Sequence, residues 1–288
     1  MTWIAFAAGS ALFAGLTAIL AKAGVAHTPS HLATALRTIV VLIGAVAMVF
    51  LVGSQHTLGQ LDPTSLVFLG LSGVSTGASW LCYFRALQLG PVSRVAAVDK
   101  SSVVLTVLFA MVLLGETDHL VPRLTGIGLI TLGTYAMVDR STWKESAGTG
   151  RRWLWYAIGS AFFAALTAIL GKVGIGEVES NLGTAIRTVV VLVMAWVVVF
   201  VTGEQHQLRQ VPRRELWFIA ASGIATGASW LCYWRAMQEG PASLVAPIDR
   251  LSILVTVGFA VAVYRERLSR REWVGLAAIV AGTLVMLG

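Results

Sequence analysis

Apolar residues gather along this chain in runs of about 20, and short polar stretches separate the runs. A helix of that length crosses a bilayer, because the hydrocarbon core is about 30 Å thick and each helical residue adds about 1.5 Å. The runs therefore predict an all-α polytopic membrane protein with ten transmembrane helices. The predicted helices are residues 3–25, 32–53, 66–90, 94–115 and 121–138, and, after a polar linker at residues 139–152, residues 153–175, 182–203, 216–240, 244–264 and 273–287.

The second half of the chain repeats the first, 150 residues later. Residues 76–83 and residues 226–233 both read TGASWLCY, and charged residues such as Arg37 and Arg187 also occupy equivalent positions. Because each half has an odd number of predicted helices, the second half must enter the membrane from the opposite side. We therefore predict two domains, residues 1–138 and residues 153–288, that form inverted-topology repeats, the architecture of many secondary transporters.

The third predicted helix of each half has a polar face. Ser72, Thr76, Ser79 and Tyr83 follow one another at spacings of four, three and four residues, which places them along one side of a helix. In an apolar helix such a face suits a substrate cavity, and tryptophan residues supply aromatic walls. The candidate substrate-binding residues are Ser72, Thr76, Ser79, Trp80 and Tyr83, with their counterparts Ser222, Thr226, Ser229, Trp230 and Tyr233. An alternative is that the hydroxyls bond carbonyls of their own helix and the aromatic rings only pack.

A second face of the same helix carries Gly73 and Gly77. Glycine lets a neighbouring helix approach closely, so this face is predicted to pack against another helix. Cys82 and Cys232 occupy equivalent positions in the two copies. We interpret them as packing residues rather than as a disulfide.

Composition and charge support a membrane protein. Hydrophobic residues make up 57% of the chain and charged residues 12%, far from the averages of soluble domains. The first apolar run has a counterpart at residues 153–175, so we expect it to be structural and not a cleaved signal peptide. The net charge of +7 does not predict nucleic-acid binding, because the basic residues gather on one side of the predicted topology.

Twelve basic residues lie in loops and helix ends on the side of the linker, against Arg123 on the side of the termini. They are Arg94, Arg140, Lys144, Arg151, Arg152, Arg209, Arg213, Arg214, Arg265, Arg267, Arg270 and Arg271. The positive-inside rule therefore predicts that the linker faces the cytoplasm and that both termini lie outside the inner membrane.

Charged residues also lie inside the predicted helices, where Asp99 and Asp249 are the acidic companions of several cations. Charges at such depth pair with one another and mark substrate paths or gates. The alternative is that long basic side chains extend to the lipid headgroups. Each membrane face receives one cluster, so we predict two gates, each closed when its aspartate pairs with an arginine. The candidate gate residues are Arg37, Arg85, Asp99 and Lys100 toward the linker side, and Arg187, Arg235, Asp249 and Arg250 toward the side of the termini.

Two repeats of five predicted helices, the stretch YFRALQLGPVSRVAAVDK and a fourth helix ending in Gly115 and Glu116 resemble the EamA-type transporters of the drug/metabolite transporter superfamily. The resemblance covers residues 3–287. It implies ten helices, a central substrate cavity lined mainly by the first four helices of each half, and alternating access. Members of this family usually have both termini in the cytoplasm, which is the reverse of what the loop charges predict here. The chain also resembles a fusion of two short single-repeat members.

Small four-helix relatives that export cations carry a glutamate in the middle of the first helix. Residues 13–17 and 163–167 of this chain contain no acid, and the excess of cations favours a neutral, zwitterionic or anionic substrate. We therefore predict a secondary transporter that moves a small polar metabolite across the inner membrane by alternating access. The alternatives are a non-transporting membrane receptor or structural membrane protein, a channel, and a multidrug exporter.

The sequence does not predict an enzyme. A GxSxG pattern at residues 73–77 lies inside an apolar helix, and the second copy replaces its serine with Ala225. All five histidines lie in predicted loops, no metal-binding motif occurs, and Glu116 and Glu266 at helix ends are interpreted as structural. We expect no catalytic residue, no cofactor and no metal. The expected partners are a small-molecule substrate and the lipid bilayer, without nucleic acid, for a monomer or a homodimer.

Overall fold

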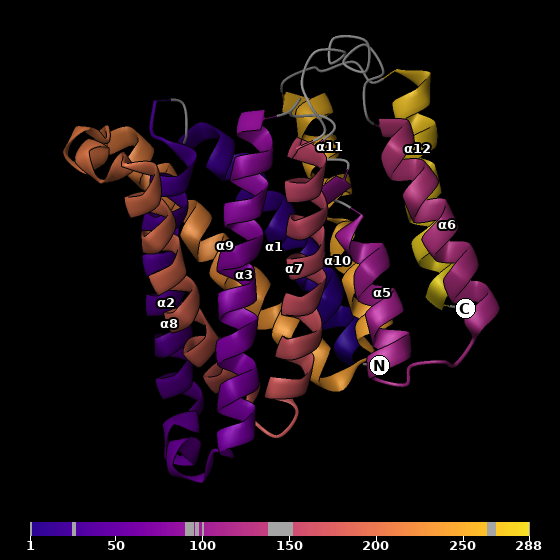
Figure 1. The fold of residues 1–288 in the computed structure, drawn as a ribbon, viewed down its shortest axis with the longest axis horizontal. Helices are drawn as coiled ribbons and strands as arrows, with labels where there is room; N and C mark the ends of the chain where they lie inside the picture. The colour runs from indigo at the N-terminus through magenta and orange to yellow at the C-terminus, as the bar shows by residue number, and fades with distance from the viewer. Residues whose placement is uncertain are drawn as a thin grey trace.

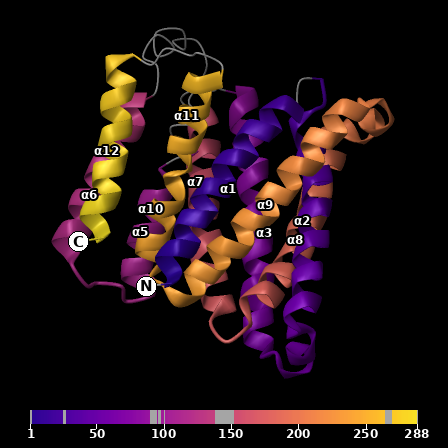
Figure 2. The ribbon, with the colours of Figure 1, turned by 180° about the vertical axis from the view of Figure 1, so that it is seen from behind.

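Long helices lie side by side in a single bundle, and α1 begins and α12 ends at the same end of it (Figures 1 and 2). We call this end the terminus end, and the opposite end, where α6 ends and α7 begins, the linker end. The computed structural model describes residues 2–24, 27–89, 95, 98–99, 101–137, 152–263 and 269–287, and these residues form helices and connections without any strand.

The first half contains α1 (Thr2–Gly24), α2 (Ser30–Val52), the 3₁₀ helix η1 (Ser54–Gln60), α3 (Pro63–Leu89), α5 (Ser102–Leu113) and α6 (Leu120–Met137). The second half contains α7 (Arg152–Ile175), α8 (Ser180–Thr202), the 3₁₀ helix η3 (Glu204–Gln210), α9 (Arg213–Glu239), α10 (Ala242–Arg250), α11 (Ser252–Val263) and α12 (Arg270–Leu287). Within the described residues, seven segments are long and apolar enough to cross a membrane. The chain is an all-α multi-pass membrane protein.

Neither half packs as a bundle of its own. α1 of the first half packs along α9 of the second half, and the equivalent helix α7 packs along α3. α2 packs against its own counterpart α8, and α6 against its counterpart α12. The two halves are therefore related by an approximate twofold symmetry. The helices of each half bury their packing faces against helices of the other half.

Glycine sets the closest approaches between the halves. A Cβ atom at Gly73 of α3 would lie 2.7 Å from the Cβ atom of Val190 in α8. The equivalent Gly223 of α9 would meet Val40 of α2 at the same distance. Such contacts leave no room for a side chain, so the glycine face of the third helix is a packing face, as the sequence predicts.

The fourth predicted helix of the second half is broken. α10 ends at Arg250 and α11 begins at Ser252, with Leu251 in a turn between them. Pro247 lies inside α10 and lacks the N–H group of a regular helical residue, which weakens the helix just before the break. In membrane transporters, broken helices with such turns frequently border the substrate site.

The first half has a turn at the equivalent residue, Ser101, directly before α5. Residue 97, the counterpart of the proline, is alanine. A turn therefore forms at this position without a proline four residues earlier. In both halves an aspartate, Asp99 or Asp249, stands two residues before the turn.

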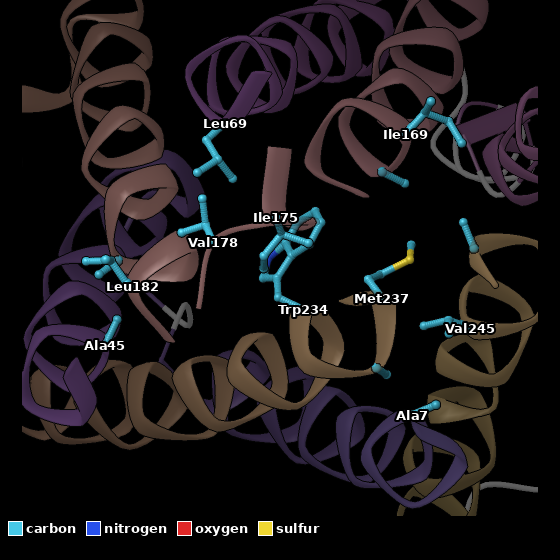
Figure 3. Packing of buried hydrophobic residues seen from close by; sticks show 14 of the residues in the cluster. Ala7, Ala45, Leu69, Ile169, Ile175, Val178, Leu182, Trp234, Met237 and Val245 are labelled. Carbon is cyan, nitrogen blue, oxygen red and sulfur yellow. The ribbon is translucent and has the colours of Figure 1, made fainter. Parts of the chain in front are cut away.

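The largest cluster of buried apolar side chains lies at the terminus end of the bundle. Its members include Leu69 of α3, Ile175 of α7 and Met237 of α9. Figure 3 shows the indole ring of Trp234 beside Ile175 at the centre of this cluster. Ile175 is the last residue of α7, and Met237 is close to the end of α9. The cluster therefore fills the space between α3, α7 and α9 at the terminus end.

Gly73→Ala should lower the melting temperature of the purified protein in detergent, because the added methyl group would overlap Val190. Overpacking of this kind costs about 1–3 kcal/mol. Gly70→Ala is the matched control, since it lies on the same helix and its Cβ atom would have nothing within 4 Å. That control should melt at the wild-type temperature or above, because alanine favours helix over glycine. Equal melting temperatures of the two variants would contradict close packing of α3 on α8.

Candidate substrate cavity

A cavity of about 280 Å³ lies between the two halves. Its walls come from α1 and α3 of the first half and from α7, α8, α9 and α10 of the second half. Six of the predicted substrate-binding residues line it: Thr76, Ser79, Trp80, Ser229, Trp230 and Tyr233. Arg187 and Asp249, which the sequence suggests as gate residues, line the same cavity. Within the described residues, no group of three or more His, Cys, Asp and Glu side chains could hold a metal ion.

Arg187 is the cation of the cavity wall, and it is only 3% exposed. Its Nε atom donates to Ser72 Oγ at 3.0 Å, and its Nη2 atom donates to Thr76 Oγ1 at 2.7 Å. Its third nitrogen, Nη1, is buried and has no hydrogen-bond partner among the described residues. A buried donor without a partner costs free energy, so Nη1 is a donor that a ligand in the cavity would satisfy.

Two indole rings cover the guanidinium group of Arg187. Its Cζ atom lies 5.2 Å from the ring centre of Trp230 and 4.6 Å from that of Trp234. A cation over the face of an indole ring is attracted to it, and the attraction grows when water is excluded. These contacts offset part of the cost of burying the charge and hold Arg187 against the cavity.

Asp249 is the acidic residue of the cavity lining, and a serine of the first half bonds it. Ser10 Oγ of α1 donates to Asp249 Oδ1 at 2.6 Å. Ser229 Oγ of α9 donates in turn to the carbonyl oxygen of Ser10 at 3.1 Å. The carboxylate of α10 is thus connected to a helix of the first half and, through it, to α9.

The same network occurs around Asp99. Ser160 Oγ of α7 donates to Asp99 Oδ1 at 2.8 Å, and Ser79 Oγ of α3 donates to the carbonyl oxygen of Ser160 at 3.0 Å. Each aspartate is therefore bonded to the first helix of the other half. The two halves therefore repeat these hydrogen bonds as well as the sequence.

The hydroxyl groups of the polar face have partners inside the protein. Thr76 Oγ1 and Thr226 Oγ1 donate to carbonyl oxygens one turn earlier in their own helices, at 3.0 and 2.7 Å. Ser72 Oγ donates to the carbonyl oxygen of Thr167 in α7 at 2.8 Å, whereas Ser222 Oγ donates to Ile219 of its own helix at 2.7 Å. On α3 the polar face therefore binds α7 and Arg187 as well as bordering the cavity.

Tyr83 lies away from the cavity lining, unlike its counterpart Tyr233. It is half-buried and packs against the small cluster of Ala86, Val95 and Ala157. Ser72, Ser222 and Thr226 are buried behind the lining and do not belong to it.

Comparison with known proteins decides the family. The model of the EamA-like transporter family matches the chain twice, over residues 1–138 and residues 151–288. The chain belongs to the EamA-like transporter family. This is a family of membrane transporters and not of enzymes, which implies a small-molecule substrate and a place in the bilayer.

Relatives of this EamA-family chain include proteins of half its length. An uncharacterized transporter of Sinorhizobium sp, encoded in the cobO 3' region, is 45% identical over 134 residues, which are 46% of this chain and 95% of that protein. A probable 4-amino-4-deoxy-L-arabinose-phosphoundecaprenol flippase subunit, ArnE, of Yersinia pseudotuberculosis is 30% identical over 83 residues, 29% of this chain and 72% of that protein. A solved crystal structure with 18% sequence identity has a TM-score of 0.79 over 100% of this chain and 98% of that one, which shows a shared fold.

The other predicted gate residues of this EamA-family chain lie at separate places. Arg235 Nε pairs with Glu239 of its own helix at 2.6 Å, and Arg250 Nη2 donates to Ser102 Oγ of α5 at 3.0 Å. Arg37 is half-buried on α2, and Arg85 is exposed on α3. Lys100 lies outside the described residues.

Sequence reasoning missed Ser10, Ser160 and Trp234. The two serines are an equivalent pair in the first helix of each half, and that equivalence was the signal available for them. Trp234 has Phe84 as its counterpart, so a search for identical residues in the two halves passes over it. Its contact with Arg187 depends on the packing of α8 against α9, which no spacing within one helix reveals.

Two charged residues hold the turn between α9 and α10. The carboxylate oxygens of Glu116 accept from the first two backbone N–H groups of α10, at 2.8 and 2.9 Å. Lys172 Nζ donates to the carbonyl oxygens of Met237 and Gly240 at the end of α9. A carboxylate at a helix N-terminus and an ammonium at a C-terminus are both favourable. This arrangement positions α10, and with it Asp249.

Proposed function

We propose that this EamA-family chain is a secondary transporter of ten transmembrane helices in two inverted repeats. It moves a small zwitterionic or anionic metabolite across the inner membrane by alternating access. The observation that carries the proposal is the pair of opposite charges on the wall of one cavity. Arg187 offers a buried donor that has no hydrogen-bond partner among the described residues, and Asp249 offers a carboxylate.

The arginine supports a substrate with an anionic group. Guanidinium donates to carboxylate and phosphate in charge-assisted hydrogen bonds that are roughly twice as strong as neutral ones. Ser72, Thr76 and the two indole rings already orient the group, so little side-chain freedom is lost when the substrate binds. A substrate carboxylate at Nη1 would also satisfy the guanidinium nitrogen that has no hydrogen bond to any residue in the described part of the chain.

The aspartate supports a zwitterion. Asp249 borders the same cavity as Arg187, and its negative charge favours an ammonium group of the substrate over a second anionic group. Ser229 and Tyr233 supply polar atoms to the lining near it. A purely cationic substrate is disfavoured, because it would meet Arg187.

The volume of the cavity supports a small metabolite. About 280 Å³ is just below the range of roughly 300–1,000 Å³ that is usual for ligand pockets. This volume suits a compact metabolite better than a bulky drug. A compact metabolite also fits this volume better than the lipid-linked sugar in the name of the Yersinia relative would.

The difference between the two halves supports alternating access. Arg187 is buried and bonded to the polar face of α3, whereas its counterpart Arg37 is half-buried, and Ser222 on α9 donates to its own helix. Because Arg37 and Arg187 occupy equivalent positions in the two repeats, exchanging the conformations of the halves would bury Arg37 and release Arg187. The apolar cluster around Trp234 supports the proposal that this conformation is the one closed at the terminus end.

Uptake into liposomes tests the proposal. Purified protein should accumulate labelled zwitterionic or anionic metabolites and not lipophilic cations. Arg187→Gln should raise the KM for such a substrate about 10- to 100-fold, because a hydrogen bond to a charged group contributes about 1.5–3 kcal/mol. Arg187→Lys should have a smaller effect on KM, since lysine keeps the positive charge and loses only the planar set of guanidinium donors.

Arg209→Gln is the control, because Arg209 is exposed on η3 and away from the cavity. It should transport as the wild type does. Accumulation of cationic drugs alone, with Arg187→Gln unchanged, would support a multidrug exporter. Binding of a metabolite without any uptake would support a receptor.

The proposed orientation places the linker and the linker end in the cytoplasm and both termini outside, as the basic loops indicate. His56 of η1 and His206 of η3 are an equivalent pair, each in a short helix after the second helix of its half. In a background without native cysteines, His56→Cys should react with a membrane-impermeant thiol reagent in intact cells. His206→Cys and Ser146→Cys should be protected until the membrane is opened. The reverse pattern would place the termini in the cytoplasm.

The two aspartates are proposed to act at opposite gates. Asp99→Asn removes the charge that accepts from Ser160, so it should loosen the linker end and speed the labelling of Cys82 by a small thiol reagent. Asp249→Asn should likewise loosen the terminus end and speed the labelling of Cys232. Cys82 and Cys232 are equivalent residues and act as matched reporters. If both variants change the labelling rates of Cys82 and Cys232 in the same direction, the aspartates are structural anchors and not gates.

A further inference from the structure

Lys172 of α7 binds the end of α9. Its Nζ atom donates to the carbonyl oxygens of Met237 and Gly240, at the terminus end of the bundle. The last four carbonyl groups of a helix have no partner within that helix, and a positive charge near them is favourable. The ammonium group on α7 is therefore well suited to hold the end of α9.

Gln238 of α9 binds the end of α7 in return. Its Nε2 atom donates to the carbonyl oxygen of Ile175, the last residue of α7, at 2.9 Å. It also donates to the carbonyl oxygen of Val178, in the connection after α7, at 2.7 Å. Ile175 and Val178 belong, with Trp234, to the apolar cluster of Figure 3. Each of the two helices thus supplies one side chain that binds the end of the other.

The contact between α7 and α9 continues to the wall of the cavity. A Cβ atom at Gly171 would lie 2.2 Å from Cη2 of Trp234, so the indole ring lies against the backbone of α7 next to Lys172. The same ring lines the cavity and covers the guanidinium group of Arg187. Joining α7 to α9 therefore closes the space beside the cavity on the side of the terminus end.

The first half carries the same pair of residues. Lys22 of α1 is equivalent to Lys172, and Gln88 of α3 is equivalent to Gln238. The ends of α1 and α3 lie at the linker end of the bundle. Within the described residues, α7 packs against α9, whereas α1 and α3 do not form a comparable contact. The two ends of the bundle therefore differ in the present conformation.

We propose that Lys172 and Gln238 hold the gate closed at the terminus end, and that Lys22 and Gln88 hold the opposite gate closed in the other conformation. These gates rest on the proposed function, because they exist only in a protein that alternates between two conformations. When a gate opens, water replaces the carbonyl oxygens as the partner of the ammonium and amide groups. The exchange of partners makes the net free energy of each bond small, so the bonds can break and form in every cycle.

Labelling of a single cysteine in the cavity from each side of the membrane tests this proposal. In a background without native cysteines, Ala164→Cys places a thiol on α7 in the cavity lining. A membrane-impermeant thiol reagent reaches this thiol through whichever end is open. Intact cells and inside-out vesicles expose the two ends in turn, so the two labelling rates measure the two openings separately, without any substrate. The protein with no other change should label faster from the side of the linker.

Lys172→Met should raise the labelling rate from the side of the termini about tenfold, because the closed state loses hydrogen bonds from a charged donor. Gln238→Leu should raise the same rate about threefold, since its bonds are neutral ones. Lys22→Met and Gln88→Leu should instead lower it, because they weaken the state that is closed at the linker end. Lys172→Arg is the conservative control, and it should have a smaller effect than Lys172→Met because it keeps a charged donor.

A structural role alone would lower the melting temperature without shifting labelling from one side to the other. Equal labelling in all variants, or shifts in the same direction for equivalent residues of the two halves, would overturn the proposal. If Lys172→Met does not fold, Gln238→Leu and Gln88→Leu make the same comparison with Lys172 intact. Opposite shifts in a protein that takes up no metabolite into liposomes would support the gates and contradict the proposed transport. Uptake without opposite shifts would contradict the gates alone.

Discussion

Close packing between the two halves is the constraint on which the rest of this structure depends. Helices in a bilayer gain little from burying apolar surface against one another, because lipid is equally apolar. They associate through small residues and interhelical hydrogen bonds instead. Gly9 lies against Cys232, and Gly159 lies against Cys82 in the equivalent place. Serine hydroxyls then join α1 to α9 and α7 to α3. Ser10, Ser79 and Ser229, which give the cavity part of its polar lining, thus also join helices of the two halves.

Burial of Arg187 follows from that packing and gives the molecule its asymmetry. A charge taken out of water is tolerated when hydrogen bonds and aromatic faces replace the lost hydration. α3 supplies two hydroxyls and α9 supplies two indole rings, so the guanidinium is enclosed by both halves at once. Only one of the two equivalent arginines has this environment in the present conformation. Two halves that repeat one another in sequence therefore give their equivalent arginines different surroundings, with Arg187 buried and Arg37 half-buried.

α3 has different neighbours on its different faces. Residues three or four apart share a helix face, so consecutive stretches of α3 face different neighbours as the helix turns. Thr76, Ser79 and Trp80 border the cavity, whereas Gly73 and Gly77 pack against α8.

The sequence by itself determined the helical class, the position of most helices and the equivalence of the two halves, because apolar run length and repetition are local properties of the chain. It also indicated the polar face of α3 and the packing face around Gly73, since both follow from helical periodicity. The partners of those faces depended on the tertiary structure. No spacing within one helix reveals that Arg187 of α8 would lie between Trp234 and Ser72, or that Ser10 would bond Asp249. Those contacts join segments more than 40 residues apart, and they exist only because each half inserts its helices between those of the other.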